Sequence, residues 1–126
     1  MASLKTRKPT ILILLMLVVA GCQSTDSNSP LLNAEPESGS VVTRTPQTLR
    51  LYFSQLPNVA GSTVQLHSSS GRELNLRGMH TMGANDLMME IYDQVPNGEY
   101  IVSWTAVLEG DTASYRGSYS FTVQAN

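Results

Sequence analysis

Short segments in which apolar and polar residues alternate strictly are the feature that most constrains the fold of this chain. Leu49, Leu51 and Phe53 alternate with polar neighbours, and the same spacing recurs along the sequence. The other apolar faces are Val64 and Leu66; Leu74 and Leu76; Leu87, Met89 and Ile91; Tyr100, Val102, Trp104 and Ala106; and Tyr119, Phe121 and Val123. Period-two alternation is typical of β-strands with one face in a core and one in water.

Turn-forming residues separate these segments, and no stretch after residue 21 shows helical periodicity. The turns fall at residues 37–40, 68–71, 83–86, 96–98 and 109–111. About seven short strands in roughly 100 residues predict an all-β fold, an Ig-like Greek-key β-sandwich spanning residues 31–126. We expect Trp104 in its core, because it lies mid-strand among inward-facing residues. The alternative is an exposed tryptophan that binds carbohydrate.

The N-terminus carries the marks of a secretory signal. A basic segment precedes an apolar run at residues 11–20, and small residues follow it. The run has about half of the roughly twenty residues that a membrane-spanning helix needs. Val-Ala-Gly-Cys at residues 19–22 resembles the bacterial lipobox. The resemblance implies that residues 1–21 are a signal peptide and that Cys22 becomes the acylated first residue of the mature protein. The alternative is an ordinary secretory signal that ends near a cysteine.

Acylation of Cys22 would attach the protein to a lipid bilayer. Several acyl chains, at about 0.8 kcal/mol per buried methylene, anchor a protein stably. Residues 22–30 then form a lipidated cysteine and a polar, flexible tether, which at about 3.3 Å per residue reaches up to roughly 30 Å. Residue 23 is Gln rather than Asp. By resemblance to lipoprotein sorting in Gram-negative bacteria, this implies a periplasmic protein anchored to the outer membrane.

The charge of the mature chain limits its partners. The signal peptide contains three of the eight basic residues and none of the ten acidic ones, so the mature chain has five arginines and a net charge of −5. This balance argues against nucleic acid as a partner. The sequence has no P-loop, dinucleotide fingerprint, His-Glu-x-x-His or nucleophile elbow, so we predict that the protein is not an enzyme.

Five motifs in the domain resemble those of the CopC family of periplasmic copper-binding domains. They are a Pro-x-x-Gly turn, a Leu-x-Phe-Ser strand, a strand that enters a polar-Gly hairpin, Pro-x-Gly-x-Tyr-x-Val-x-Trp, and a final Gly-x-Tyr-x-Phe strand. They occupy residues 33–40, 49–54, 64–71, 96–104 and 117–123. The resemblance covers residues 31–124 and implies an Ig-like sandwich that functions in copper resistance or homeostasis.

The resemblance implies different outcomes for the two oxidation states of copper. The family's cupric site uses a histidine at the mature N-terminus and an Asp-x-His before the last strand. Here the first residue is the acylated Cys22, and the Asp-x-His positions hold Asp111 and Ala113. A square-planar, nitrogen-rich Cu(II) site cannot be assembled from these residues.

In family members that bind Cu(I), the resemblance implies a site formed by a methionine-rich loop. The four methionines of the mature chain fall within eleven residues, together with His80. Thioether sulfur is a soft ligand that suits Cu(I), and imidazole is also acceptable. We expect residues 79–82 to form a loop in which His80 and Met82 bind Cu(I), with Met79 or Met88 as a third donor. Met89 shares its strand face with the core, and Met88 faces the other way.

Two interpretations remain open for these residues. Methionines also fill irregular gaps in cores, so the segment can equally pack against an end of the sandwich. His67, the second histidine, is expected on a strand surface unless its hairpin folds toward the methionines. The first hypothesis is a lipid-anchored Cu(I)-binding protein, with a copper transporter or another envelope protein as partner. The alternative is an Ig-like envelope lipoprotein without metal, which binds proteins through an exposed sheet edge.

Overall fold

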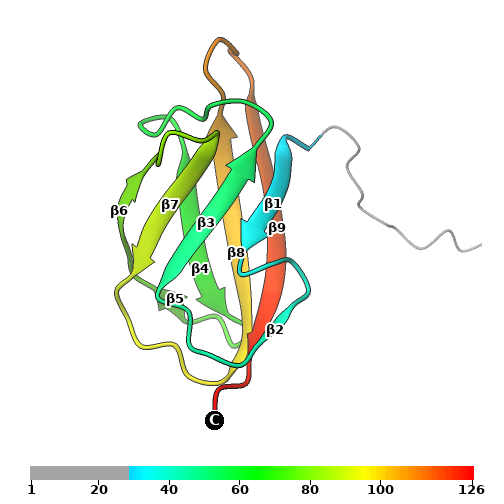
Figure 1. The fold of residues 1–126 in the computed structure, drawn as a ribbon, viewed down its shortest axis with the longest axis vertical. Coiled ribbons are helices and arrows are strands. Elements are labelled where there is room, and N and C mark those ends of the chain that lie inside the picture. The colour runs from blue at the N-terminus through cyan, green and yellow to red at the C-terminus, as the bar shows by residue number, and fades with distance from the viewer. Residues whose placement is uncertain (1–28) are drawn as a thin grey trace, which may run out of the picture.

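The computed structural model describes residues 29–126, which form nine β-strands (Figure 1). The strands are β1 (Leu31–Glu35), β2 (Val41–Val42), β3 (Thr48–Phe53), β4 (Thr63–Ser68), β5 (Glu73–Leu74), β6 (Leu76–His80), β7 (Asp86–Ile91), β8 (Gly98–Val107) and β9 (Ser114–Val123). β2 and β5 have two residues each and the other seven have five or more, which confirms the prediction of about seven strands. The predicted signal peptide and Cys22 lie outside the described residues. Within residues 29–126, no helix is long and apolar enough to cross a membrane.

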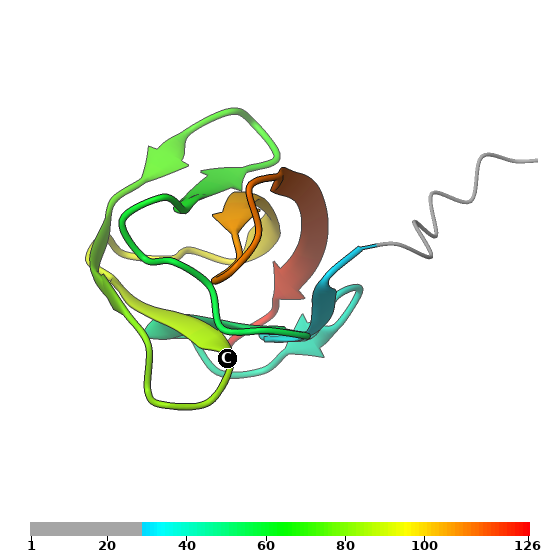
Figure 2. The same cartoon turned by 90° about the horizontal axis from the view of Figure 1, so that it is seen from above.

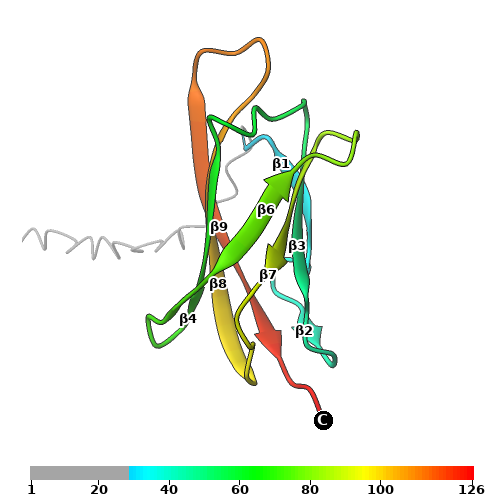
Figure 3. The same ribbon diagram turned by 90° about the vertical axis from the view of Figure 1, so that its left-hand side faces the viewer.

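The strands form two sheets that pack face to face (Figures 2 and 3). One sheet has the order β1-β3-β7-β6 and the other has the order β2-β9-β8-β4-β5. Neighbouring strands are antiparallel except for the short parallel pair of β2 and β9. β8 and β9 pair over ten residues each and make the longest hairpin. The arrangement confirms the predicted Ig-like β-sandwich.

The core lies between the sheets and contains the alternating apolar residues that the sequence predicts. Leu49 and Leu51 are fully buried, and Trp104 packs edge-on against Phe53 with ring centroids 5.4 Å apart. The core position of Trp104 is therefore confirmed. Gly117 lies opposite Trp104 on β9, and a Cβ there would come within 2.7 Å of the indole ring. A residue without a side chain is needed to let the tryptophan lie flat against the strand.

Two predictions for residues 74–82 are wrong. Residues 74–77 do not form one strand, because the chain leaves one sheet with β5 and enters the other with β6. At the break, the Asn75 amide donates a hydrogen bond to Asp93 Oδ2 at 2.8 Å. Met79 and His80 are not in a loop, because β6 extends to His80 and pairs with β7. Pairing with β7 satisfies backbone groups that a loop would leave to water.

Candidate metal site

A β-bulge in β6 decides which side chains lie on the outer face of the sheet. Arg77 pairs with Glu90, and the next pair is His80 with Met88, so β6 uses three steps where β7 uses two. One extra residue in one strand is the definition of a bulge, and Gly78 supplies it with a φ of 66°. A regular ladder would place His80 opposite the fully buried Leu87. The bulge instead turns His80 outward, beside Met88.

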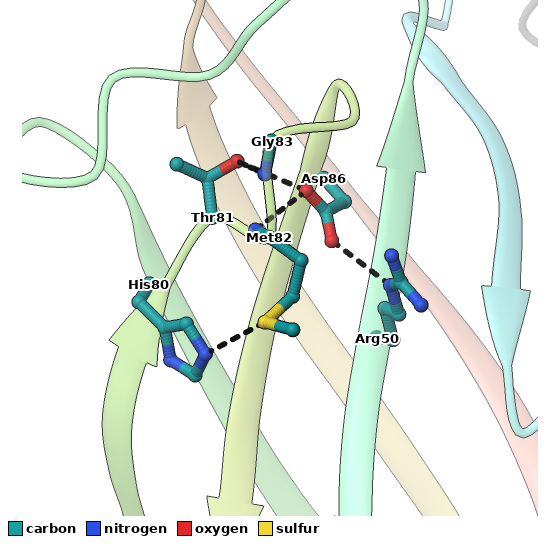
Figure 4. Close-up of polar contacts among 6 residues, drawn as sticks. All are labelled: Arg50, His80, Thr81, Met82, Gly83 and Asp86. Carbon is teal, nitrogen blue, oxygen red and sulfur yellow. Dashed lines mark hydrogen bonds and ion pairs between the residues drawn. The ribbon is translucent and has the colours of Figure 1, made fainter.

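His80 lies next to Met82, which follows the end of β6. The His80 Nε2 atom is 3.2 Å from the Met82 sulfur, and both side chains are exposed (Figure 4). The other ring nitrogen, Nδ1, bonds to the carbonyl oxygen of Gly78. A carbonyl oxygen only accepts, so the bond to Gly78 assigns a proton to Nδ1, and the tautomer with its lone pair on Nε2 is the one in which Nε2 can bind a metal ion. The bulge residue thus both places the histidine and orients its free nitrogen toward the thioether.

Asp86 fixes the turn that carries Met82. Its Oδ1 accepts hydrogen bonds from the Thr81 hydroxyl at 2.9 Å and from the Met82 amide at 3.0 Å, and its Oδ2 accepts one from Arg50 Nε at 2.9 Å (Figure 4). The side chain is fully buried. Burial acts to raise the pKa of Asp86, but the three hydrogen bonds outweigh it and lower that pKa below its ordinary value. The turn is therefore held by an ionised carboxylate.

Met88 joins this group from the neighbouring strand. Directly paired residues of antiparallel strands share a face of the sheet, so Met88 and His80 lie side by side. Both line a surface groove of ≈ 470 Å³, together with Arg77 and Glu90. Met88 is half-buried, while Met89 is 1% exposed, as predicted for a core residue.

The other sequence-predicted candidates lie elsewhere. Met79 precedes His80 by one position, so its side chain points to the opposite side of β6 and packs against the core. It lines a separate groove with Val64 and Met89. His67 is on β4 in the other sheet, between Glu73 and Ile101. The structure thus brings together His80, Met82 and Met88 and leaves Met79 and His67 apart from them.

The position of the family's cupric ligands is occupied by a closed turn. Asp111 accepts hydrogen bonds from the Ala113 amide at 3.0 Å and from the Tyr115 hydroxyl at 2.8 Å. These bonds lower the pKa of Asp111. Among residues 29–126, no cluster of three His, Cys, Asp or Glu side chains is placed to hold a metal ion.

Sequence reasoning missed the two residues that position the site. Gly78 is a glycine inside a strand, which often marks a bulge, and that signal was present in the sequence. Asp86 precedes an apolar strand segment and resembles an ordinary turn residue. Nothing in its spacing from Arg50 or Thr81 indicates that the three meet.

Comparison with known proteins finds relatives of the fold and a known sequence motif at the N-terminus. Residues 7–23 match the prokaryotic membrane lipoprotein lipid attachment site. No curated protein is significantly similar to the sequence. The structure is similar to that of PcoC, a methionine-rich copper resistance protein from Escherichia coli, with a TM-score of 0.69 and 26% identity over 76% of this chain and 98% of PcoC.

A second solved structure shares the fold at lower identity. CopC from Methylosinus trichosporium OB3b has a TM-score of 0.68 and 22% identity, over 77% of this chain and 94% of that one. The model of the CopC domain matches residues 31–124, which is nearly the whole region described by the structure. The chain therefore belongs to the CopC domain family, and it carries a lipoprotein attachment site ahead of the domain.

Proposed function

We propose that this chain is a lipid-anchored copper resistance protein of the bacterial periplasm that binds Cu(I) through His80 and Met82. The observation that carries the proposal is the 3.2 Å separation between His80 Nε2 and the Met82 sulfur, while the other ring nitrogen is bonded to the Gly78 carbonyl. Two donor atoms this close can bind one ion without a large rearrangement. Soft thioether and borderline imidazole donors suit Cu(I).

Met88 is the third donor that the geometry favours. It lies beside His80 on the same face of the sheet, whereas Met79 is turned toward the core. Membership of the CopC family supports copper as the metal. So does the likeness to PcoC, which is described as a methionine-rich copper resistance protein.

The exposure of the site favours exchange of the metal over permanent storage. Met82 is 56% exposed, so a bound ion would be accessible to an incoming ligand. A copper transporter or another envelope protein is the partner that such a site would serve. The lipid anchor at Cys22 would keep the domain in the periplasm, and Gln23 favours the outer membrane as its location.

Competition between the mature domain and a chromogenic Cu(I) chelator tests the proposal. We expect one Cu(I) per domain, and at least a tenfold loss of affinity, about 1.4 kcal/mol, in His80→Ala and in Met82→Leu. His67→Ala and Met79→Leu are matched controls, because they remove the same donor types outside the site, and they should leave the affinity unchanged. Micromolar or weaker binding that neither substitution alters would contradict the proposal and favour the metal-free interaction module.

A further inference from the structure

The end of the sandwich that carries Met82 is also the end at which the chain enters the domain. The Ser54 amide donates a hydrogen bond to the Pro30 carbonyl at 2.9 Å, and the Phe53 amide donates one to the Asn85 carbonyl at 2.7 Å. The start of β1, the end of β3 and the turn at residues 81–85 are therefore adjacent (Figures 1 and 3). We call this region, made of residues 30–32, 54–62 and 81–85, the tether end.

The three segments of the tether end are uncharged and expose apolar side chains. Residues 54–62 and 81–85 contain no Asp, Glu, Lys or Arg. Leu32 is 69% exposed, Leu56 is 39% exposed and Met82 is 56% exposed. The opposite end, by contrast, carries charged residues in each of its turns, including Glu37, Arg44, Arg72 and Asp93.

The length of chain between Cys22 and the domain limits which surface can meet the membrane. Pro30 follows Cys22 by eight positions, which at no more than about 3.6 Å each span at most about 29 Å. The ten residues of β8 run the length of the sandwich, roughly 34 Å at about 3.4 Å per residue. When the long axis of the sandwich stands perpendicular to the bilayer, the opposite end cannot touch it, because Pro30 would then lie farther from Cys22 than the chain can reach.

We propose that the tether end rests on the bilayer that holds the acylated Cys22, with Leu32, Leu56 and Met82 facing the lipid headgroups. Burial of exposed apolar side chains in the interfacial region is favourable, and residues 30–32, 54–62 and 81–85 themselves carry no charge that would have to be dehydrated. Two carboxylates, Glu109 and Asp111, lie on the β8–β9 turn, which borders the tether end at Leu56, where the Glu109 amide donates a hydrogen bond to the Leu56 carbonyl at 2.8 Å. Figure 3 shows this turn on the other side of the molecule from the β6–β7 turn. The contact therefore lies on the β1-β3-β7 side, and it presents the His80–Met82 pair to the membrane surface.

Fluorescence of the metal-free, acylated protein in vesicles of phosphatidylethanolamine and phosphatidylglycerol tests this orientation. Acylation blocks the only native thiol, so Leu56→Cys and Val41→Cys each accept one environment-sensitive fluorophore. At position 56 we expect a blue-shifted emission that lipids spin-labelled near the headgroup quench. Val41 is exposed at the opposite end, so position 41 should show neither effect. Equal quenching at the two positions, or quenching only at position 41, would overturn the proposal.

A second substitution tests whether apolar contact causes the orientation. Leu32→Ser should reduce lipid quenching of the probe at position 56, whereas Val41→Ser should not change it. Both residues are exposed, so neither substitution threatens the fold. Unchanged quenching in Leu32→Ser would refute the assigned contact surface. The inference rests on the anchor at Cys22 and not on copper, so its failure would leave the proposed Cu(I) site untouched.

Discussion

Asp86 is the residue on which the position of Met82 depends. It is the one acceptor shared by the Thr81 hydroxyl, the Met82 amide and the Arg50 guanidinium. Without it, the turn after β6 would lose two bonds at the point where His80 and Met82 approach each other. The carboxylate therefore acts on the site through the turn and contacts neither proposed donor atom.

We expect Asp86→Ala to destabilise the domain by about 2–3 kcal/mol, because hydrogen bonds to a buried charged group are lost and their donors are left without an acceptor. Urea denaturation of the mature domain measures the loss. Glu90→Gln is the matched control, since Glu90 is exposed on the same strand, and it should change the stability by less than about 0.5 kcal/mol. A similar loss in both variants would show that the buried bonds are not the cause.

The stability that Asp86 contributes should depend on pH. Its folded-state pKa is lowered below the ordinary value of about 3.9, so the native state binds fewer protons than the unfolded state around that pH. The contribution is fully present above about pH 5 and is lost as the pH falls through the folded-state pKa. The difference in unfolding free energy between wild type and Asp86→Ala should therefore shrink as the pH falls from 7 to 3. A constant difference would mean that the carboxylate charge is not involved.

At the scale of elements, the bulge in β6 turns His80, one of the proposed metal ligands, onto the outer face of the sheet. Gly78 adopts a left-handed conformation that other residues reach only with strain. A Cβ at Gly78 would meet no atom within 4 Å, so the backbone conformation alone resists substitution. Because of the bulge, the Met79 side chain faces the core and the His80 side chain faces outward.

Gly78→Ala should therefore weaken Cu(I) binding while the sandwich stays folded. The left-handed conformation costs an alanine about 1–2 kcal/mol, which favours a regular ladder that turns His80 away from Met88. Chelator competition measures the affinity, and circular dichroism checks the fold. Gly71→Ala is the control, because Gly71 also has a positive φ and lies in the distant β4–β5 turn. Equal affinity in the wild type and in Gly78→Ala would contradict the role of the bulge.

The elements could be predicted from the sequence where their packing is regular. The alternation of residues 49–53, 87–91 and 100–106 follows directly from burial of one strand face, and the structure confirms each. The glycine at position 78 is a sequence signal for a bulge, but the change of sheet at Asn75 and the register after Gly78 could not be predicted, because they depend on how β6 pairs with β7. Register decides on which face of the sheet each side chain lies. The sequence alone therefore does not show that Met79 and His80 lie on opposite faces.

At the scale of the whole molecule, a β-sandwich follows a lipoprotein attachment site after a short stretch of chain. The core places the proposed site, and residues 7–23 match a lipoprotein lipid attachment site. In the proposed function, residues 22 and 23 would set the membrane at which the copper chemistry takes place.

Membrane fractionation tests the proposed location in the outer membrane. We expect the wild-type protein in the outer-membrane fraction and Gln23→Asp in the inner-membrane fraction. In the lipoprotein sorting of Gram-negative bacteria, whose substrates the N-terminal sequence resembles, Asp after the acylated cysteine retains the protein in the inner membrane. Gln23→Asn keeps a neutral side chain and should fractionate as the wild type does. An inner-membrane location for the wild type would refute the proposed outer-membrane anchor.

X-ray absorption at the copper edge of the Cu(I)-loaded mature domain tests directly whether His80, Met82 and Met88 bind the metal. The proposed site predicts both imidazole nitrogen and thioether sulfur as neighbours of the metal. The sulfur contribution should fall in Met82→Leu and in Met88→Leu, and the imidazole contribution should disappear in His80→Ala. Met79→Leu should leave the spectrum unchanged. A spectrum without sulfur scattering, or one that these three site substitutions do not alter, would contradict a Cu(I) site on this face of the sandwich.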